Sequence, residues 1–446
     1  MKRQAMRILE EWKNNPARKP LIIRGARQVG KTWLMKEFGK KFFANVAYIN
    51  FENNERMQQV FRGDLGIKRL IAALQIESGI SISAQNTLLI FDEVQEVPQA
   101  LTALKYFHEN APEYAIIAAG SLLGVAMHKG TSFPVGKVFF MDLYPMSFTE
   151  FLDATENENL HKLIQQRDWD LITPFKNRYI ELLRSYYFIG GMPEAVASFV
   201  EQNNYSEVRE IQIRLLTAYE QDFSKHAPNQ AIPRIRMVWD SIPAQLARDN
   251  RKFIYGCLRK GARAKDFELA IQWLHDCGLI YQVQRISKPA MPLTAYPASG
   301  FKIFMLDIGL LAAKSGLDDR SILKSNTIFE EFKGSLTEQY VQQQLRSELA
   351  ITPCYWSNEN SHAEVDFIFQ NGADIIPLEV KAAENLQSKS LKSYCAKYSP
   401  KVAIRTSMSD YRQEEKLTNL PLYAISQLQN ECRASTVLKN QNNQAT

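Results

Sequence analysis

The segment from Gly25 to Thr32 has the residue types and spacing of a phosphate-binding loop. It is a full match to the pattern G-x-x-x-x-G-K-[ST], and it follows an apolar run and precedes a helix-like stretch. In such a loop the backbone N–H groups wrap around phosphate oxygens, and the N-terminus of the next helix adds positive potential. The residues expected to bind a nucleotide are Gly25, Ala26, Arg27, Gln28, Val29, Gly30, Lys31 and Thr32.

Two side chains of this loop carry specific roles. We expect Lys31 to reach the β- and γ-phosphates and the hydroxyl of Thr32 to hold Mg²⁺, so ATP and Mg²⁺ are the predicted cofactors. The alternative is a glycine-rich strand-to-helix turn that binds no ligand. The complete motif in its strand–loop–helix context favours the nucleotide.

An acidic pair, Asp92 and Glu93, directly follows the apolar run Leu88–Phe91. Asp92 is expected to serve Mg²⁺, and Glu93 is placed to accept the proton of an attacking water. Ser121 ends the next apolar run, where its hydroxyl could orient that water or sense the γ-phosphate. The alternatives are an acidic pair that caps a loop and a simple turn hydroxyl.

A second group of polar residues lies late in the chain. Glu379 and Lys381 are two residues apart on an expected strand, so both side chains point to one face, and Asp366 lies in the preceding strand-like run. Two carboxylates and an amine can bind a divalent cation, with Mg²⁺ favoured by the hard oxygen ligands, and activate water to cleave a phosphodiester. The alternatives are a chance match and a solvated Glu/Lys strand face.

The elements that position the first group form an alternating pattern. Short apolar runs alternate with longer helix-like stretches, which is typical of a parallel sheet covered by helices. The expected strands are Leu21–Arg24, Val46–Phe51, Leu88–Phe91, Tyr114–Ala119 and Val138–Leu143. Ser147 and Glu150 have capping-box spacing after Pro145, so an α/β head is predicted over residues 1–150.

The remainder of the chain divides by periodicity. The sequence predicts a helical extension over residues 151–225. It predicts a winged-helix-like module over residues 226–325, because a helix that starts near Arg263 and ends at Gly278 is followed by a strand-like run. The same order occurs in many other α+β pieces. Residues 326–430 predict a small α/β domain, and residues 431–446 a polar tail.

Taken together, these motifs resemble the AAA-superfamily ATPases of bacteria and archaea that join a P-loop head to a tail of unknown function ending in a restriction-nuclease-like fold. The resemblance runs from about Arg7 to about Ile404. The matching segments are Gly25–Thr32, Asp92-Glu93, Gly120-Ser121, Leu143–Phe151, Gly190–Glu194, Lys260–Asp266 and Glu379–Lys381.

The resemblance implies an α/β P-loop head of AAA type, a helical middle part and a nuclease-like C-terminal domain. It also implies a further carboxylate, Glu338, at the place where the nuclease-like fold often has one. The family often carries Gly-Arg before the last head strand, whereas this sequence has Gly136-Lys137. The identity of an arginine finger is therefore open, and one could come from a neighbouring copy in a homo-oligomer.

Positive charge is concentrated in one stretch. The whole chain has a net charge of +6, while residues 234–265 contain nine basic and two acidic side chains, a net charge of +7. Aromatic Trp239, Phe253 and Tyr255 interleave with this basic segment, which favours a DNA-binding surface. The alternatives are a solvated helix face and an interdomain contact with the slightly acidic C-terminal part.

Membrane, secreted and metal-cluster classes are disfavoured. The longest uncharged apolar run, Ala115–Met127, has 13 residues, whereas a spanning helix needs about 20. The N-terminal residues have no continuous apolar core for a signal peptide. Five cysteines, odd in number and without a C-x-x-C pair, suggest neither disulfides nor a zinc site, and fit a reducing cytoplasm.

These observations lead to one hypothesis and one alternative. The hypothesis is a cytoplasmic, Mg²⁺-dependent ATPase that uses nucleotide binding and hydrolysis to move its nuclease-like tail, acting on DNA. The alternative is a nucleotide-controlled interaction protein or signalling switch, in which the tail is a docking module without catalytic activity.

Overall fold

The computed structural model describes residues 1–121, 136–248, 251–323, 330–358, 363–384, 388–414 and 416–433. The chain forms two compact units. The head unit comprises Lys2–Tyr144 and Gln272–Leu279, and the tail unit comprises Pro145–Ile271 and Ile280–Thr446 together with Met1. The predicted polar tail lies outside the described residues beyond Arg433.

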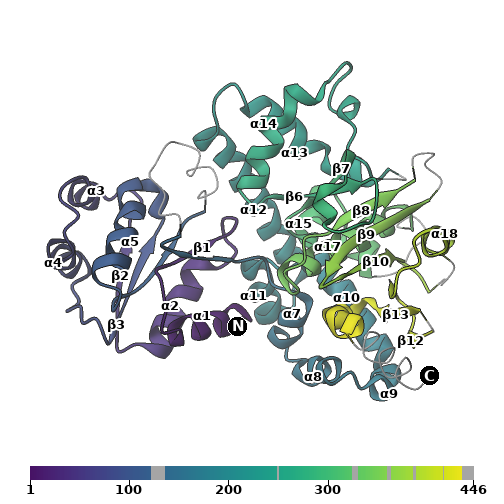
Figure 1. Cartoon of the computed structure of the whole chain (residues 1–446), viewed down its shortest axis with the longest axis horizontal. Coiled ribbons are helices and arrows are strands. Elements are labelled where there is room, and N and C mark those ends of the chain that lie inside the picture. Colours follow the sequence, from purple (N-terminus) through teal and green to yellow (C-terminus); the bar gives the residue numbers. More distant parts are fainter. Residues whose placement is uncertain are drawn as a thin grey trace. The chain divides into compact units, whose positions relative to one another are not determined.

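The head unit contains a five-stranded, wholly parallel sheet, as the alternating pattern predicts (Figure 1). Its strand order is β2-β3-β4-β1-β5, so the phosphate loop after β1 and the acidic pair after β3 leave the same edge of the sheet on strands separated only by β4. The strands are β1 (Leu21–Arg24), β2 (Asn45–Asn50), β3 (Thr87–Asp92), β4 (Ala115–Ala119) and β5 (Phe139–Asp142). All five predicted strands are confirmed.

Helices pack on this sheet because its strands are apolar on both faces. One face is filled by Phe51, Phe61 and Phe91, whose rings meet edge to face with centroids 5.4–6.0 Å apart. The helical segments of the head are α1 (Ala5–Asn14), α2 (Lys31–Phe42), α3 (Glu55–Arg62), α4 (Ile67–Ser78), η1 (Val94–Glu96) and α5 (Pro98–Asn110).

The tail unit begins with helix α7 (Phe148–Ala154), which starts at the predicted capping box. The Ser147 hydroxyl accepts a bond from the Glu150 backbone N–H, and the Glu150 carboxylate accepts one from the Ser147 N–H. The following helical segments are α8 (Glu158–Gln166), α9 (Trp169–Ile172), η2 (Thr173–Phe175), α10 (Lys176–Ile189), α11 (Pro193–Gln202), α12 (Tyr205–His226), α13 (Ile232–Leu246) and η3 (Tyr255–Cys257). Helix α14 (Ala264–Asp276) begins in the tail unit, and its residues from Gln272 onward belong to the head unit.

A mixed, eight-stranded sheet forms the second half of the tail unit, in the order β12-β13-β11-β10-β9-β8-β6-β7 (Figure 1). Its strands are β6 (Ile280–Ile286), β7 (Pro297–Met305), β8 (Cys354–Ser357), β9 (Glu364–Asn371), β10 (Asp374–Val380), β11 (Ala403–Ser407), β12 (Arg412–Gln413) and β13 (Leu417–Pro421). The helical segments among them are η4 (Leu293–Ala295), α15 (Ile308–Lys314), α16 (Asp319–Leu323), α17 (Glu330–Ser347), α18 (Lys389–Tyr398) and η6 (Leu422–Gln427).

This sheet crosses the boundary expected near residue 325. Helix α14, Gly278 and β6 occur in the order predicted for a winged helix, and β6 and β7 form an antiparallel hairpin. However, β6 also pairs in parallel with β8. The hairpin therefore extends the sheet of the C-terminal α/β part instead of forming a separate small sheet.

Buried glutamines hold helix α17 in place. The side-chain oxygens of Gln339, Gln343 and Gln344 accept bonds of 2.8–2.9 Å from the backbone N–H groups of β7, α15 and α7. Because the amides satisfy buried backbone donors far apart in sequence, they fix the rotation of α17 about its own axis. This rotation decides where Glu338, on the same helix, points.

No helix within the described ranges has the length and apolar character needed to cross a membrane.

Candidate active site

The phosphate loop has a backbone conformation that its glycines permit. Gly25 and Gly30 have φ angles of +148° and +94°, and Gln28 lies in the left-handed region at +66°. A Cβ atom at Gly25 would lie 2.2 Å from the carbonyl oxygen of Leu143, so a side chain there would displace the backbone. The loop is therefore held in a tight curve at the N-terminus of α2.

Lys31 is buried inside this curve. Its Nζ donates bonds of 2.9 and 2.8 Å to the carbonyl oxygens of Gly25 and Ala26. Burial lowers the pKa of Lys31 to about 8, although the negative charges of Glu93 and Asp92 act in the opposite direction. A desolvated ammonium next to backbone N–H donors binds a phosphate anion strongly.

Asp92 meets the loop through Thr32. The Thr32 hydroxyl donates to Asp92 Oδ2 at 2.6 Å, and the Tyr48 hydroxyl donates to the same oxygen at 2.9 Å. The second oxygen of Asp92 accepts the Glu93 backbone N–H at 3.1 Å. Burial, reinforced by Asp92, raises the pKa of Tyr48, so this hydroxyl remains a donor. The predicted pair of Mg²⁺-binding side chains is thus preassembled.

Glu93 is held by a strained backbone and two polar neighbours. Its φ angle is +49°, which is unusual for a residue other than glycine. Its Oε2 accepts a bond of 2.6 Å from the Gln95 amide and one of 3.4 Å from the Ser121 hydroxyl. Strands β3 and β4 therefore bring Glu93 and Ser121 together, as expected from their positions after neighbouring strands.

Three residues of this site carry no motif that sequence reasoning could use. Tyr48 and Gln95 contact the acidic pair, and Arg3 donates bonds of 3.1 and 2.7 Å to the carbonyl oxygens of Val29 and Tyr144. Arg3 thereby braces the phosphate loop against the chain segment that leaves β5.

The late group of residues also comes together in space. Lys381 Nζ lies 2.8 Å from Glu379 Oε1, and Asp366 Oδ2 accepts the Val380 backbone N–H at 2.8 Å. Burial, together with the charges of Glu338 and Glu379, raises the pKa of Asp366 well above its usual range. We call Glu338, Asp366 and Glu379 the carboxylate cluster.

Two basic side chains that sequence reasoning did not connect with this cluster enter it. Arg251 donates from Nη1 to Glu338 Oε1, and the fully buried Lys302 lies 3.4 Å from Glu338 Oε2 and 2.6 Å from Glu364. Burial opposes ionisation of Glu338, but Arg251 and Lys302 outweigh it and hold its pKa below the usual value. Glu338 is therefore ionised, and Arg251 and Lys302 compensate its negative charge.

The cluster does not have the arrangement of a metal site. Across the described residues, no three His, Cys, Asp or Glu side chains are placed to hold one metal ion together. Glu338 is already paired with Arg251 and Lys302, which leaves less ligand charge for Mg²⁺. Nuclease chemistry at Glu338, Asp366, Glu379 and Lys381 stays a prediction.

The basic segment divides into buried and exposed residues. Trp239 is fully buried against Phe223, with ring centroids 5.7 Å apart, and Phe253 stacks on Phe301 at 5.2 Å. These two rings are core residues and cannot stack on bases from the surface, whereas Tyr255 is only partly buried. The basic residues classed as exposed are Arg234, Arg236, Arg248, Arg259, Lys260, Arg263 and Lys265, whereas Asp249 lies outside the described residues.

Family models match three parts of the chain. Residues 17–152 match an AAA domain, residues 180–321 match one domain of unknown function, and residues 333–425 match another. The head unit has the fold of an AAA-type P-loop ATPase. The parallel sheet and the loop after β1 agree with this, so the predicted head is confirmed at the level of fold. Neither tail model carries a nuclease description.

Solved structures give weaker similarities. The Walker-type ATPase of Pyrococcus abyssi is 15% identical with a TM-score of 0.42, covering 70% of this chain and 95% of that one. The ORC1 protein of Aeropyrum pernix, solved in complex with DNA, is 11% identical with a TM-score of 0.26, covering 70% and 90%. Cdc6p of Pyrobaculum aerophilum is 11% identical with a TM-score of 0.24, covering 76% and 94%.

No protein of curated function matches the chain. The assignment of the head fold therefore rests on the matched AAA domain and on the strand order of the sheet.

Proposed function

We propose that this protein binds ATP with Mg²⁺ in the head unit and hydrolyses it, with Glu93 as the base that activates water. The observation that carries the proposal is the position of Glu93 Oε2. It is held by Gln95 and Ser121, and the Glu93 carboxylate acts electrostatically on Lys31 of the phosphate loop. An acidic residue that only capped a loop would need neither a backbone in the left-handed region nor the side chains of Gln95 and Ser121 to orient its carboxylate.

The side chains fit a magnesium ion. Thr32 and Asp92 present hard oxygen atoms that already lie 2.6 Å apart, and Asp92 is almost fully buried and further oriented by Tyr48. Mg²⁺ bound here would neutralise charge on the β- and γ-phosphates. Thr32 would be its direct ligand, and Asp92 would orient its hydration shell.

The other residues supply binding and orientation. Backbone N–H groups from Gly25 to Thr32 receive phosphate oxygens, and Lys31 exchanges its two carbonyl contacts for phosphate oxygen contacts. Glu93 accepts a proton from the attacking water, while the Ser121 hydroxyl helps to hold that water in line. Because the water position is set by fixed side chains, little reorganisation is needed at the moment of reaction.

The test is phosphate release from ATP by the full chain with and without Mg²⁺. We expect hydrolysis that requires Mg²⁺ and is abolished in Lys31→Ala. The matched control is Lys40→Ala, which replaces an exposed lysine on the same helix. Equal turnover in the Lys31→Ala protein would rule out hydrolysis at this site.

We propose further that the tail unit contacts DNA through the start of α14. Four basic residues, Arg259, Lys260, Arg263 and Lys265, are exposed within seven positions of the chain. Contacts between such a cluster and phosphates release counterions, so the affinity must fall steeply with salt. Because Trp239 and Phe253 are buried, contacts with the DNA backbone are favoured over stacking of bases on these two rings.

A fluorescence-anisotropy titration of duplex DNA at 50 and 200 mM salt tests this contact. Replacing the four residues by glutamine should weaken binding and flatten the salt dependence, whereas glutamine at exposed Lys40 and Lys41, on the head unit, should change neither. Binding that is absent or insensitive to salt would favour the alternative function, a nucleotide-controlled switch with a docking tail.

A further inference from the structure

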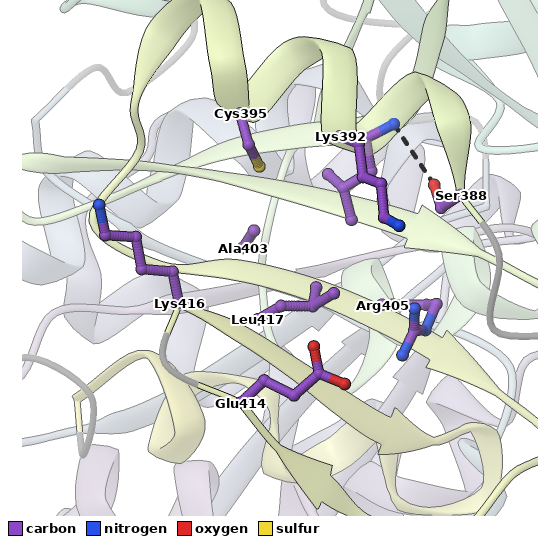
Figure 2. Close-up of a pocket in the computed structure, with 9 residues that line it drawn as sticks. Ser388, Lys392, Cys395, Ala403, Arg405, Glu414, Lys416 and Leu417 are labelled. Carbon is purple, nitrogen blue, oxygen red and sulfur yellow. Dashed lines mark hydrogen bonds between the residues drawn. The ribbon is translucent and has the colours of Figure 1, made fainter.

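A cavity of about 270 Å³ lies in the tail unit between helix α18 and strands β11 and β13. Figure 2 shows the side chains that line it, which come from the helix, from the strands and from the segment before β13. None of them belongs to the nucleotide site or to the carboxylate cluster. The cavity therefore needs an explanation of its own.

One part of the lining is apolar. Leu391 on α18, Ala403 on β11 and Leu417 on β13 line the cavity together with the thiol of Cys395. Leu391 and Ala403 are buried and belong to the apolar core beneath the helix. Burial raises the pKa of Cys395, so this thiol remains neutral. This part of the cavity suits a small apolar group.

The other part of the lining is basic. Arg405, Lys392 and Lys416 line the cavity with a single acidic residue, Glu414, which gives the lining a net charge of +2. Arg405 is only 4% exposed, and its Nε donates to Asn419 Oδ1 at 3.1 Å, so its guanidinium has a fixed orientation. Burial lowers the pKa of Arg405, which shows that this cation is incompletely solvated.

The helix beside the cavity adds to this positive potential. Ser388 lines the cavity and caps α18, because its hydroxyl accepts the backbone N–H of Leu391 at 3.3 Å. From residue 388 to residue 401 the sequence contains four lysines and no acidic residue. A helix N-terminus together with a buried arginine and two lysines attracts an anion.

We infer that this cavity binds a small organic anion, in which an apolar body about the size of one ring carries a phosphate or carboxylate group. The apolar body would lie on Leu391, Ala403 and Leu417, and the anionic group would face Arg405 and the lysines. Since a water occupies about 30 Å³, the cavity has room for roughly nine water-sized groups, which suits a body of about one ring.

Isothermal titration calorimetry of the full chain tests the inference with phenyl phosphate and benzoate as probes. Phenol and inorganic phosphate represent the apolar half and the anionic half of phenyl phosphate. We expect one-to-one binding of phenyl phosphate or benzoate, tighter than binding of either half. The tighter of the two probes identifies the anionic group. If neither probe binds better than its halves, the inference is wrong.

Two variants locate the binding in the cavity. Ala403→Leu fills the apolar part without changing the charge, and Arg405→Gln removes the buried cation. Each should weaken probe binding by about tenfold or more, as expected for loss of a charge-assisted bond or of an apolar contact. Lys401→Gln is the control, because Lys401 pairs with Asp374 at 2.7 Å and does not line the cavity.

If Arg405→Gln does not fold because Asn419 loses one of its partners, exposed Lys392 offers a milder change, and Lys392→Gln should weaken binding in the same direction. Unchanged binding in the folded Ala403→Leu protein would contradict the inference, because no probe could then occupy the cavity.

Discussion

The Thr32 hydroxyl donates a hydrogen bond of 2.6 Å to Asp92 Oδ2, across 60 positions of the sequence. This contact joins the loop after β1 to the end of β3, two strands that are not adjacent in the sheet. It brings together the two side chains to which Mg²⁺ binding is assigned, so the site is assembled by the fold of the head unit.

Replacing Thr32 by valine keeps the shape of the side chain and removes the hydroxyl. We expect Mg²⁺-dependent ATP hydrolysis to fall by roughly 10- to 100-fold, since a bond to a charged partner contributes about 1.5–3 kcal/mol. The apparent Mg²⁺ affinity, measured by titrating turnover with Mg²⁺, should fall in parallel. Thr217→Val, which removes a hydroxyl bonded only to a carbonyl of its own helix α12, should leave both quantities unchanged.

The pKa of Lys31 predicts opposite pH dependences for nucleotide binding and for stability. ATP binding needs the ammonium form, so the affinity for a fluorescent ATP analogue should weaken as the pH rises through about 8. Between about 8 and the ordinary value of 10.5 the unfolded chain holds more protons than the folded one. The folded state without nucleotide therefore gains stability from this group over the same interval.

Thermal unfolding of the nucleotide-free wild type and of Lys31→Met between pH 7 and pH 9.5 isolates this effect. The stability of the wild type relative to the variant should increase with pH, and the affinity for nucleotide should decrease. A relative stability that falls with pH would mean that Lys31 is not desolvated.

The pair formed by Arg251 and Glu338 predicts a large effect on stability. Arg251→Gln leaves a buried carboxylate with less compensation, and breaking such a pair typically costs about 3–5 kcal/mol of unfolding free energy. Urea unfolding measures the loss. The double variant Arg251→Met/Glu338→Gln should lose less than the single one, because no uncompensated charge remains. Equal losses would show that Arg251 acts through packing alone.

The pairing of Glu338 with Arg251 and Lys302 argues against the nuclease activity that the sequence motif predicts, and a plasmid assay decides between the two. With Glu338 neutralised by Arg251 and Lys302, supercoiled plasmid should remain intact with Mg²⁺ or Mn²⁺, with and without ATP. Agarose electrophoresis of wild type and Lys381→Ala gives the answer. Nicking by the wild type that disappears in Lys381→Ala would establish the nuclease that the sequence motif suggests.

The head unit could be predicted from the sequence because its chemistry is local. The loop from Gly25 to Thr32 and the pair Asp92-Glu93 are short motifs beside apolar strands, and parallel strand order brings such loop ends to one edge. Tyr48 could not be predicted, because it is one polar residue in a strand and nothing in its neighbourhood marks the face on which Asp92 lies.

The tail unit was harder to predict because its interactions are distant in sequence. Arg251 and Glu338 are 87 residues apart. The segment of Arg251 is joined to β7 by the bond from the Phe253 N–H to the Phe301 carbonyl, and helix α17 is joined to the end of α13 by the bond from the Ser335 hydroxyl to the Leu246 carbonyl. The sequence predicts Arg251 as one of nine basic residues on a surface, and no local pattern indicates these distant contacts.

The central claim is that Glu93 activates water for ATP hydrolysis, and Glu93→Gln tests it most directly because the amide keeps the size of the side chain. Single-turnover hydrolysis and binding of a fluorescent ATP analogue should be measured on the same protein, with exposed Glu96→Gln as the control. The account predicts unchanged nucleotide affinity, loss of turnover by at least about 100-fold, as is typical for removal of a general base, and a control with wild-type activity. Hydrolysis at the wild-type rate in Glu93→Gln would contradict it.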